Sequence, residues 1–129
     1  MPIGIYYVRE KDLWNDTLTL YATGEFPLAL AENLKKMTKR IVGSKRFDSC
    51  GDLLREEMVS RAFTHVCLAL WDKKFNPKHG SRVYSWASRV ILNECIKTIQ
   101  EEQKRKRNFG EFAVQHSLTG YVEIITPNP

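Results

Sequence analysis

Apolar residues recur at every third or fourth position through most of the chain, which is the spacing of one face of an amphipathic α-helix. This pattern predicts helices at about residues 10–22, 28–42, 52–71 and 82–107. The core-facing positions of the third helix follow the same spacing: Val59, Ala62, Phe63, Val66 and Leu70. A pattern compatible with a short strand occurs only at residues 121–126. We therefore predict an all-α fold, a compact bundle of about four helices with an extended C-terminal tail.

Turn-forming residues separate the predicted helices. Gly24 and Pro27 end the first, and Gly43 is the expected C-cap of the second. A loop with the sequence DKKFNPKHG precedes the fourth helix, for which Ser81 is the expected N-cap. The length of 129 residues fits one domain. We place this domain at residues 1–107 and the tail at residues 108–129.

The fourth predicted helix has a polar stripe on one side. On a helical wheel one side holds Arg82, Trp86, Arg89, Asn93 and Gln100, with Lys97 at the edge. Arginine pairs with phosphates or base edges, an amide can recognise adenine, and an aromatic ring can stack on an unpaired base. The stripe therefore suits nucleic acid. The alternative is that Trp86 is an edge residue of the core and that the arginines are solvated.

Positive charge is concentrated around this helix. The net charge of the whole chain is +5, but residues 1–72 contain 10 basic and 10 acidic side chains, whereas residues 73–107 contain 10 basic and 3 acidic ones. The helix ends with four consecutive cations, at 104–107, which also complement the negative end of the helix dipole. A local basic segment favours a polyanionic partner, and a solvated basic face is the alternative.

The sequence lacks the groups that an enzyme needs. The three histidines are isolated, no metal-binding or phosphate-loop motif occurs, and Cys67 falls on an apolar helix face. Three scattered cysteines do not indicate a disulfide scaffold, and the sequence predicts neither a signal peptide nor a membrane span. We expect a non-enzymatic protein of a reducing cytosolic compartment, without cofactor or metal and with no membrane partner.

Two stretches resemble the second conserved region of bacterial sigma factors. DLLREE, at 52–57, matches in Asp52 and Leu53, and FNPKHGSRVYSWASRVILNECI, at 75–96, matches in Phe75, Pro77, Gly80, Trp86, Arg89, Val90 and Asn93. Over about residues 6–107 the chain is most similar to the small late-transcription sigma factors of tailed bacteriophages. Housekeeping sigma factors have two adjacent tryptophans where this chain has Arg89 and Val90.

This resemblance implies a transcription initiation factor that acts in the host bacterial cytoplasm. Its third helix would dock on the clamp coiled coil of the largest subunit of core RNA polymerase through Asp52, Arg55, Glu56 and Glu57, where Glu56 and Glu57 compete for one role. The fourth helix would recognise and melt a −10-like late promoter element. The residues implied for promoter DNA are Arg82, Tyr84, Trp86, Arg89, Asn93, Lys97, Gln100, Lys104, Arg105, Lys106 and Arg107.

The tail contains a second motif, QHSLTGYV, which resembles the peptide that binds ring-shaped sliding clamps. The matching residues are Gln115, Leu118, Tyr121 and Val122. Leu118 and Tyr121 would enter an apolar pocket from a single turn while Gln115 forms a hydrogen bond nearby. A tail that folds back as a strand is the alternative.

Two other functions fit the same sequence. The chain could be a regulator that occupies the sigma site of the polymerase without recognising a promoter. It could also be an autonomous basic DNA-binding protein, although the balanced charge of residues 1–72 argues against that.

Overall fold

The computed structural model describes residues 8–118, with side chains up to residue 110. Its elements in chain order are α1 (Glu10–Thr23), α2 (Leu28–Val42), the 3-10 helix η1 (Lys45–Phe47), α3 (Asp52–Trp71), the 3-10 helix η2 (Pro77–His79) and α4 (Val83–Leu118). The described part of the chain contains no strand, so the predicted all-α fold is confirmed.

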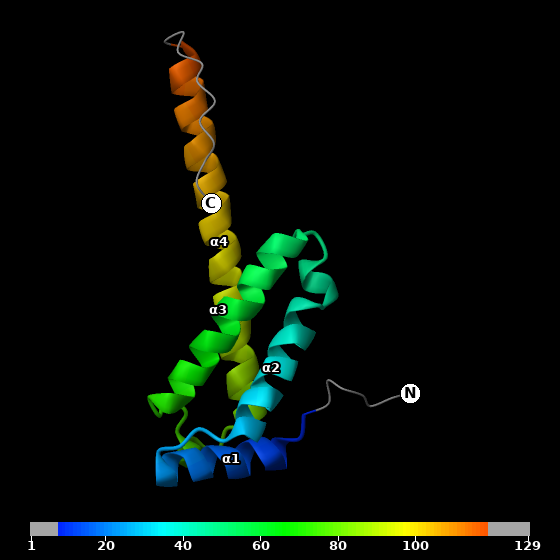
Figure 1. The fold of residues 1–129 in the computed structure, drawn as a ribbon, viewed down its shortest axis with the longest axis vertical. Coiled ribbons are helices and arrows are strands. Elements are labelled where there is room, and N and C mark those ends of the chain that lie inside the picture. Colours follow the sequence, from blue (N-terminus) through cyan, green and yellow to red (C-terminus); the bar gives the residue numbers. More distant parts are fainter. Residues whose placement is uncertain (1–7, 119–129) are drawn as a thin grey trace.

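The helices form a bundle with α1 across one end. α2, α3 and α4 pack on one another, and α1 crosses their lower end in the view of Figure 1. α4 continues well beyond the other helices at the opposite end (Figure 1). The N-terminal half of α4 is therefore part of the bundle, and its C-terminal half projects from it.

The core lies where the apolar stripes of the helices meet. Its largest fully buried side chains come from every helix and one loop, and include Leu13, Leu34, Met58, Phe75 and Ile91. In α3 the predicted core positions Ala62, Val66 and Leu70 are buried, whereas Val59 and Phe63 are only half-buried. The stripe of α3 is thus rotated slightly from the prediction, and Met58 takes a core position instead.

The first three helices have the predicted limits to within one residue, since α1 ends at Thr23, but the last helix does not. α2 and α3 match the sequence prediction, and the amide of Gly43 bonds to the carbonyl of Lys39 at the end of α2, as expected for a C-cap. α4 runs to Leu118 instead of about residue 107. Residues 108–118 therefore extend the helix and are not part of an extended tail. Their sequence contains no proline, and the single Gly110 costs only about 1 kcal/mol relative to alanine.

A residue of α1 caps the N-terminus of α4. The carboxylate of Glu10 accepts hydrogen bonds from the backbone amides of Val83, at 3.0 Å, and Tyr84, at 2.8 Å. The first turn of a helix has amides without intrahelical partners and a positive dipole end, so a carboxylate is well suited there. The prediction that Ser81 is the N-cap is wrong, because the helix begins at Val83 and the acceptor comes from another helix.

The loop before α4 is anchored by Phe75. Its ring is 1 % exposed and lies edge-on to Trp14, at 6.1 Å between centroids, and to Trp86, at 5.5 Å. The hydroxyl of Tyr21 donates to the carbonyl of Phe75 at 2.7 Å. The loop then turns at Gly80, which has a φ of 74°, in the left-handed region that favours glycine. These contacts fix where α4 begins relative to α1.

Replacing the capping carboxylate should destabilise the fold measurably. We expect Glu10→Ala to lower the free energy of unfolding by about 1–2 kcal/mol, because two amides lose a charged acceptor at a helix N-terminus. Urea denaturation followed by circular dichroism measures this difference. Asp12→Ala is the control: Asp12 is an exposed acid of the same helix turn whose only described ion pair, with Arg9, spans 3.8 Å. Equal midpoints for the two variants would contradict the capping role.

Candidate partner and nucleic-acid interfaces

The polar stripe of α4 faces away from the bundle. Val83, Ala87, Ile91 and Cys95 are fully buried and follow one another at intervals of four residues. On the opposite side, the stripe residues Arg82, Arg89, Asn93, Lys97 and Gln100 are all exposed. Within residues 8–110 none of these five side chains forms an ion pair or a side-chain hydrogen bond. The predicted stripe is therefore exposed to solvent, and the polar side chains of these five residues have no partner within residues 8–110.

Trp86 is half-buried, so it is both an edge residue of the core and part of the exposed stripe. One side of its ring packs on Phe75, at 5.5 Å between centroids, and the remainder is open to solvent. This contact holds the indole in place between Arg82 and Arg89, which are four and three residues away on the same face. Tyr84 is also half-buried, and its hydroxyl accepts a hydrogen bond from the guanidinium of Arg40 at 2.8 Å.

The cations at the end of the predicted helix lie on the projecting part of α4. Lys104, Lys106 and Arg107 are exposed, whereas Arg105 is half-buried and pairs with Glu102. Because α4 does not end there, these cations are not at the negative end of the helix dipole. The structural explanation of this basic run therefore does not apply, and its charge is available to a partner.

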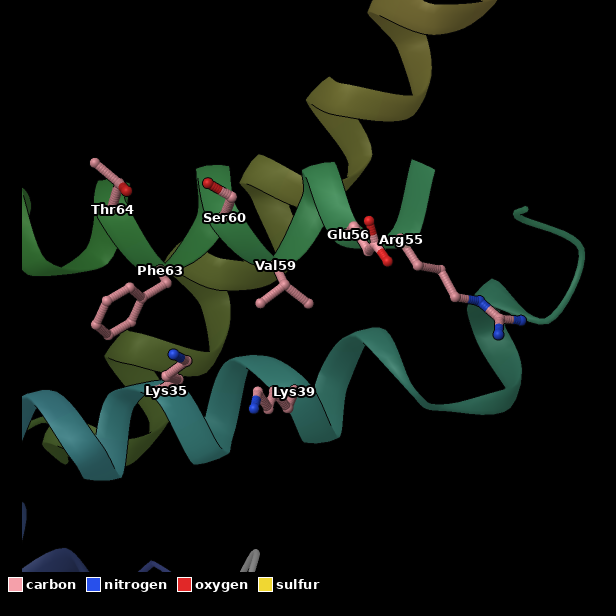
Figure 2. A pocket seen from close by; sticks show the side chains of 8 residues that line it. All are labelled: Lys35, Lys39, Arg55, Glu56, Val59, Ser60, Phe63 and Thr64. Atoms are coloured by element: carbon pink, nitrogen blue, oxygen red, sulfur yellow. The ribbon is translucent and has the colours of Figure 1, made fainter. Parts of the chain in front are cut away.

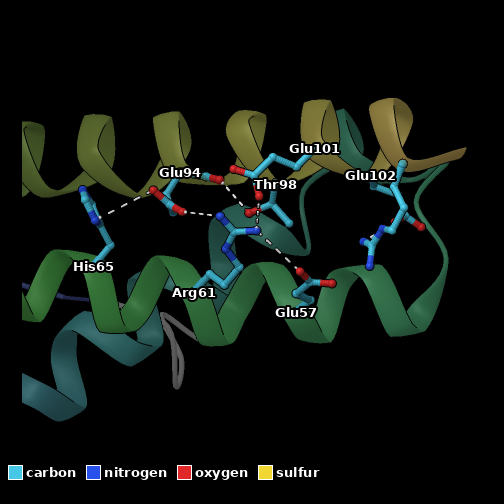
Figure 3. A network of polar contacts seen from close by, with 8 residues as sticks. Glu57, Arg61, His65, Glu94, Thr98, Glu101 and Glu102 are labelled. Carbon is cyan, nitrogen blue, oxygen red and sulfur yellow. Dashed lines mark hydrogen bonds and ion pairs between the residues drawn. The ribbon is translucent and has the colours of Figure 1, made fainter. Parts of the chain in front are cut away.

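A network of charged side chains joins α3 to α4 (Figure 3). The guanidinium of Arg61 contacts Glu57 at 3.5 Å, Glu94 at 3.2 Å and Glu101 at 2.8 Å. The side chain of Glu94 is only 10 % exposed, and the imidazole of His65 lies 3.8 Å from its carboxylate. The hydrogen bond to Glu101 and the neighbouring carboxylates raise the pKa of Arg61 further, so it is always charged. The network was not predicted, because the spacing within one helix does not show which side chains of another helix lie opposite it.

The four residues implied for polymerase binding have different environments. Asp52 and Glu56 are exposed and have no ion pair among residues 8–110. Glu57 is half-buried and pairs with Arg61, so Glu56 is the free carboxylate of the two. Arg55 donates to the carbonyls of Phe47, at 3.0 Å, and Asp48, at 2.9 Å. Its guanidinium thus fixes the turn before α3, a structural role that the sequence did not reveal.

The outer face of α3 is partly apolar. Leu53 is 83 % exposed, Leu68 56 % and Trp71 54 %, and with Glu56 they recur along the helix at intervals that place them near one face. Beside this face, α2 and α3 enclose an open groove of about 440 Å³ (Figure 2). Val59 and Phe63 point into it from α3, and Lys35 and Lys39 border it from α2 (Figure 2). Large exposed apolar side chains next to such a groove are typical of a protein-binding surface.

The remaining sequence expectations concern the cysteines, metal binding, membrane spans and the sliding-clamp motif. Burial raises the pKa of the Cys67 and Cys95 thiols to about 11, so both are protonated at neutral pH. Among the side chains that the structure describes, up to residue 110, there is no cluster of three potential metal ligands, and no helix within residues 8–118 is long and apolar enough to cross a membrane. Of the sliding-clamp motif, Gln115 and Leu118 lie in the last turns of α4, and Tyr121 and Val122 lie outside the described residues.

Comparison with models of known protein families, with curated proteins and with solved structures finds no match for this chain.

Arg61 should be important for stability. We expect Arg61→Ala to lower the free energy of unfolding by about 2–3 kcal/mol, because it leaves the nearly buried charge of Glu94 without its main partner. The double variant Arg61→Ala with Glu94→Gln should recover part of this loss, since no buried charge remains. Arg89→Ala is the control, because it removes the same side chain from an exposed position and should change stability by less than about 0.5 kcal/mol. Urea denaturation measures all of these values, and an unchanged midpoint for Arg61→Ala would contradict this role.

The same network predicts a dependence on pH. The hydrogen bond from Arg61 lowers the pKa of Glu101 below its ordinary value of 4.5. A lowered folded-state pKa stabilises the fold above the unfolded-state value, and this stabilisation is lost as the pH falls through the folded-state value. Wild type should therefore melt at a higher temperature than Glu101→Gln at neutral pH, and the two should converge as the pH falls below 4.5. A difference in melting temperature that persists in strong acid would contradict this assignment.

Proposed function

We propose that this chain is a sigma-like transcription initiation factor of a bacteriophage, which binds a bacterial-type core RNA polymerase and recognises a −10-like late promoter element. The observation that supports this most is the pair of exposed faces on the two helices that pack together. α3 presents Asp52, Glu56 and exposed apolar side chains, and α4 presents free arginines, an amide and a tryptophan. Because α3 and α4 bury their inner faces against each other, their outer faces point in different directions, which supports the proposal of two different partners.

The chemistry of each face suits the proposed partner. The acidic and apolar face of α3 fits a protein surface, and the cationic face of α4 fits a polyanion. Among the side chains of α3 the only lysine or arginine residues are Arg55 and Arg61, and both are occupied within the fold, so the outer faces of α3 and α4 are not interchangeable. A factor of this kind joins an enzyme to DNA and needs no catalytic groups of its own.

Promoter opening needs a surface that stabilises an unpaired base. Flipping a base out of a duplex costs a few kcal/mol, and stacking on an aromatic side chain returns about 1–3 kcal/mol. Trp86 offers the exposed part of its indole for stacking, and Arg89 supplies a charge at a position where housekeeping sigma factors have a tryptophan. In this chain, phosphate pairing would thus contribute more of the stabilisation, and a second aromatic ring less.

The DNA face is tested by start-site-specific transcription. Core polymerase mixed with this chain should start transcripts at sites that core alone does not use. We expect Trp86→Ala combined with Arg89→Ala to reduce these transcripts at least about tenfold, because stacking and one phosphate pair are lost. Retention of core polymerase by the tagged variant should not change. Arg89→Ala alone tests the face without altering the contact of Trp86 with Phe75, and Lys11→Ala, an exposed cation of α1, is the control.

The polymerase face is tested by retention of core polymerase on the tagged chain. Asp52→Lys combined with Glu56→Lys should weaken retention at least about tenfold, because reversed charges repel the surface that the carboxylates attract. Glu25→Lys combined with Glu32→Lys is the matched control, since it reverses two exposed acids elsewhere. Equal retention of both double variants would contradict the assignment of this face.

These assays also separate the alternatives. Core binding without new start sites would favour a regulator that only occupies the sigma site. Salt-dependent binding to duplex DNA with no contribution from polymerase would favour an autonomous DNA-binding protein. The sliding-clamp peptide at residues 115–122 remains a separate proposal, since the tests above do not depend on it.

A further inference from the structure

A second groove lies between α2 and α4. It has a volume of about 310 Å³ and is lined by Arg40, Ile41, Ser44, Arg46, Tyr84, Ser88 and Leu92. Three elements contribute to it: the end of α2, the turn with η1 and the first turns of α4. No acidic side chain lines it, which distinguishes it from the groove between α2 and α3, where Glu56 lies beside the lysines.

The cations of this groove are not neutralised. Within residues 8–110 neither Arg40 nor Arg46 forms an ion pair, although Arg55 and Arg61 both do. Arg40 is held over the groove because it donates to the hydroxyl of Tyr84 at 2.8 Å. That hydroxyl accepts the bond, so its own proton can be donated to a ligand. Two guanidinium groups, a phenol and the hydroxyl of Ser88 therefore converge as donors on one space.

The groove adjoins the polar stripe of α4. Its lining residue Leu92 is three positions after Arg89, and Ser88 immediately precedes Arg89. Residues three or four apart are neighbours on a helix surface. Arg89, with exposed donors of its own, therefore connects the groove to Trp86 and Asn93. The result is a continuous cationic surface from the end of α2 across α4.

We infer that this groove binds a backbone phosphate of a nucleic-acid strand that crosses α4. This rests on the proposed function, because it assumes a strand at Trp86 and Asn93. Arginine and hydroxyl donors are the groups that contact phosphate oxygens in proteins. The half-buried Ile41 and Leu92 give the groove apolar edges against which a sugar can lie. The groove would position the strand without recognising its sequence.

The isolated full-length chain and a labelled oligo(dT) strand test this site, since phosphate contacts do not depend on base sequence. We expect Arg40→Ala combined with Arg46→Ala to weaken binding about tenfold at low salt and to reduce the slope of log K against log salt by about 1, because each phosphate contact on a single strand contributes about 0.7. Lys35→Ala combined with Lys39→Ala is the matched control, because it removes the same charge from the side of α2 that faces α3. Arg46→Ala alone keeps the bond between Arg40 and Tyr84 and should give part of the effect.

The outcomes separate this inference from the proposed function. If both double variants lose the same affinity and slope, the groove has no specific role, and the inference is wrong even if promoter-dependent transcription is observed. The inference is also wrong if Arg40 and Arg46 bind inorganic phosphate but this phosphate displaces the strand no better than chloride at equal ionic strength, because the groove would then be a site for the free anion only. A loss confined to the Arg40 and Arg46 variants supports the inference, whether or not the polymerase assays succeed.

Discussion

The packing of α3 against α4 determines which side chains of this protein can meet a partner. Each helix buries one face in that contact, and the contact is closed along one edge by the guanidinium of Arg61 between three carboxylates (Figure 3). A buried carboxylate such as Glu94 is tolerated only with a close cation. The network and the buried apolar stripe of α4 together fix the rotation of this helix about its axis, and this rotation turns the stripe from Arg82 to Gln100 outwards. If α4 were rotated by half a turn, its cations would be buried without partners.

The position of α4 along its axis depends on a second set of contacts. Glu10 binds the first amides of α4, and Phe75 lies beneath Trp86. The loop motif that resembles sigma factors thus has a structural role in this chain, because Phe75 is a core residue and Gly80 permits the turn. Trp86 belongs to both the core and the proposed DNA face. Its packing limits the freedom of the indole, so that stacking on a base would cost little additional order.

The sequence predicts the helices well because their signals are local. The apolar spacing and the turn residues gave the limits of α2 and α3, and the wheel of the fourth helix gave its exposed stripe. The contacts that fix the helices to one another are not local: Glu10 is bonded to Val83, Arg61 to Glu94, and Arg40 to Tyr84. A pattern within one helix does not reveal such partners. Arg55 and Arg61 thus resembled surface cations although both are occupied within the fold.

The charge of a short segment of this chain can differ from the charge averaged over a longer one. Averaged over residues 1–72, basic and acidic side chains balance, yet residues 33–47 contain six basic side chains and no acidic one. The fold separates four of these six. Lys35 and Lys39 line the groove between α2 and α3 together with Glu56, whereas Arg40, from α2, and Arg46, from η1, line the acid-free groove beside Tyr84. The first pair shares its groove with a carboxylate, and the second pair does not. Electrostatic attraction for the proposed polyanion would therefore come mainly from Arg40, Arg46 and α4. The folded arrangement supports the proposal of a nucleic-acid strand on this side of the protein more than the net charge of +5 does.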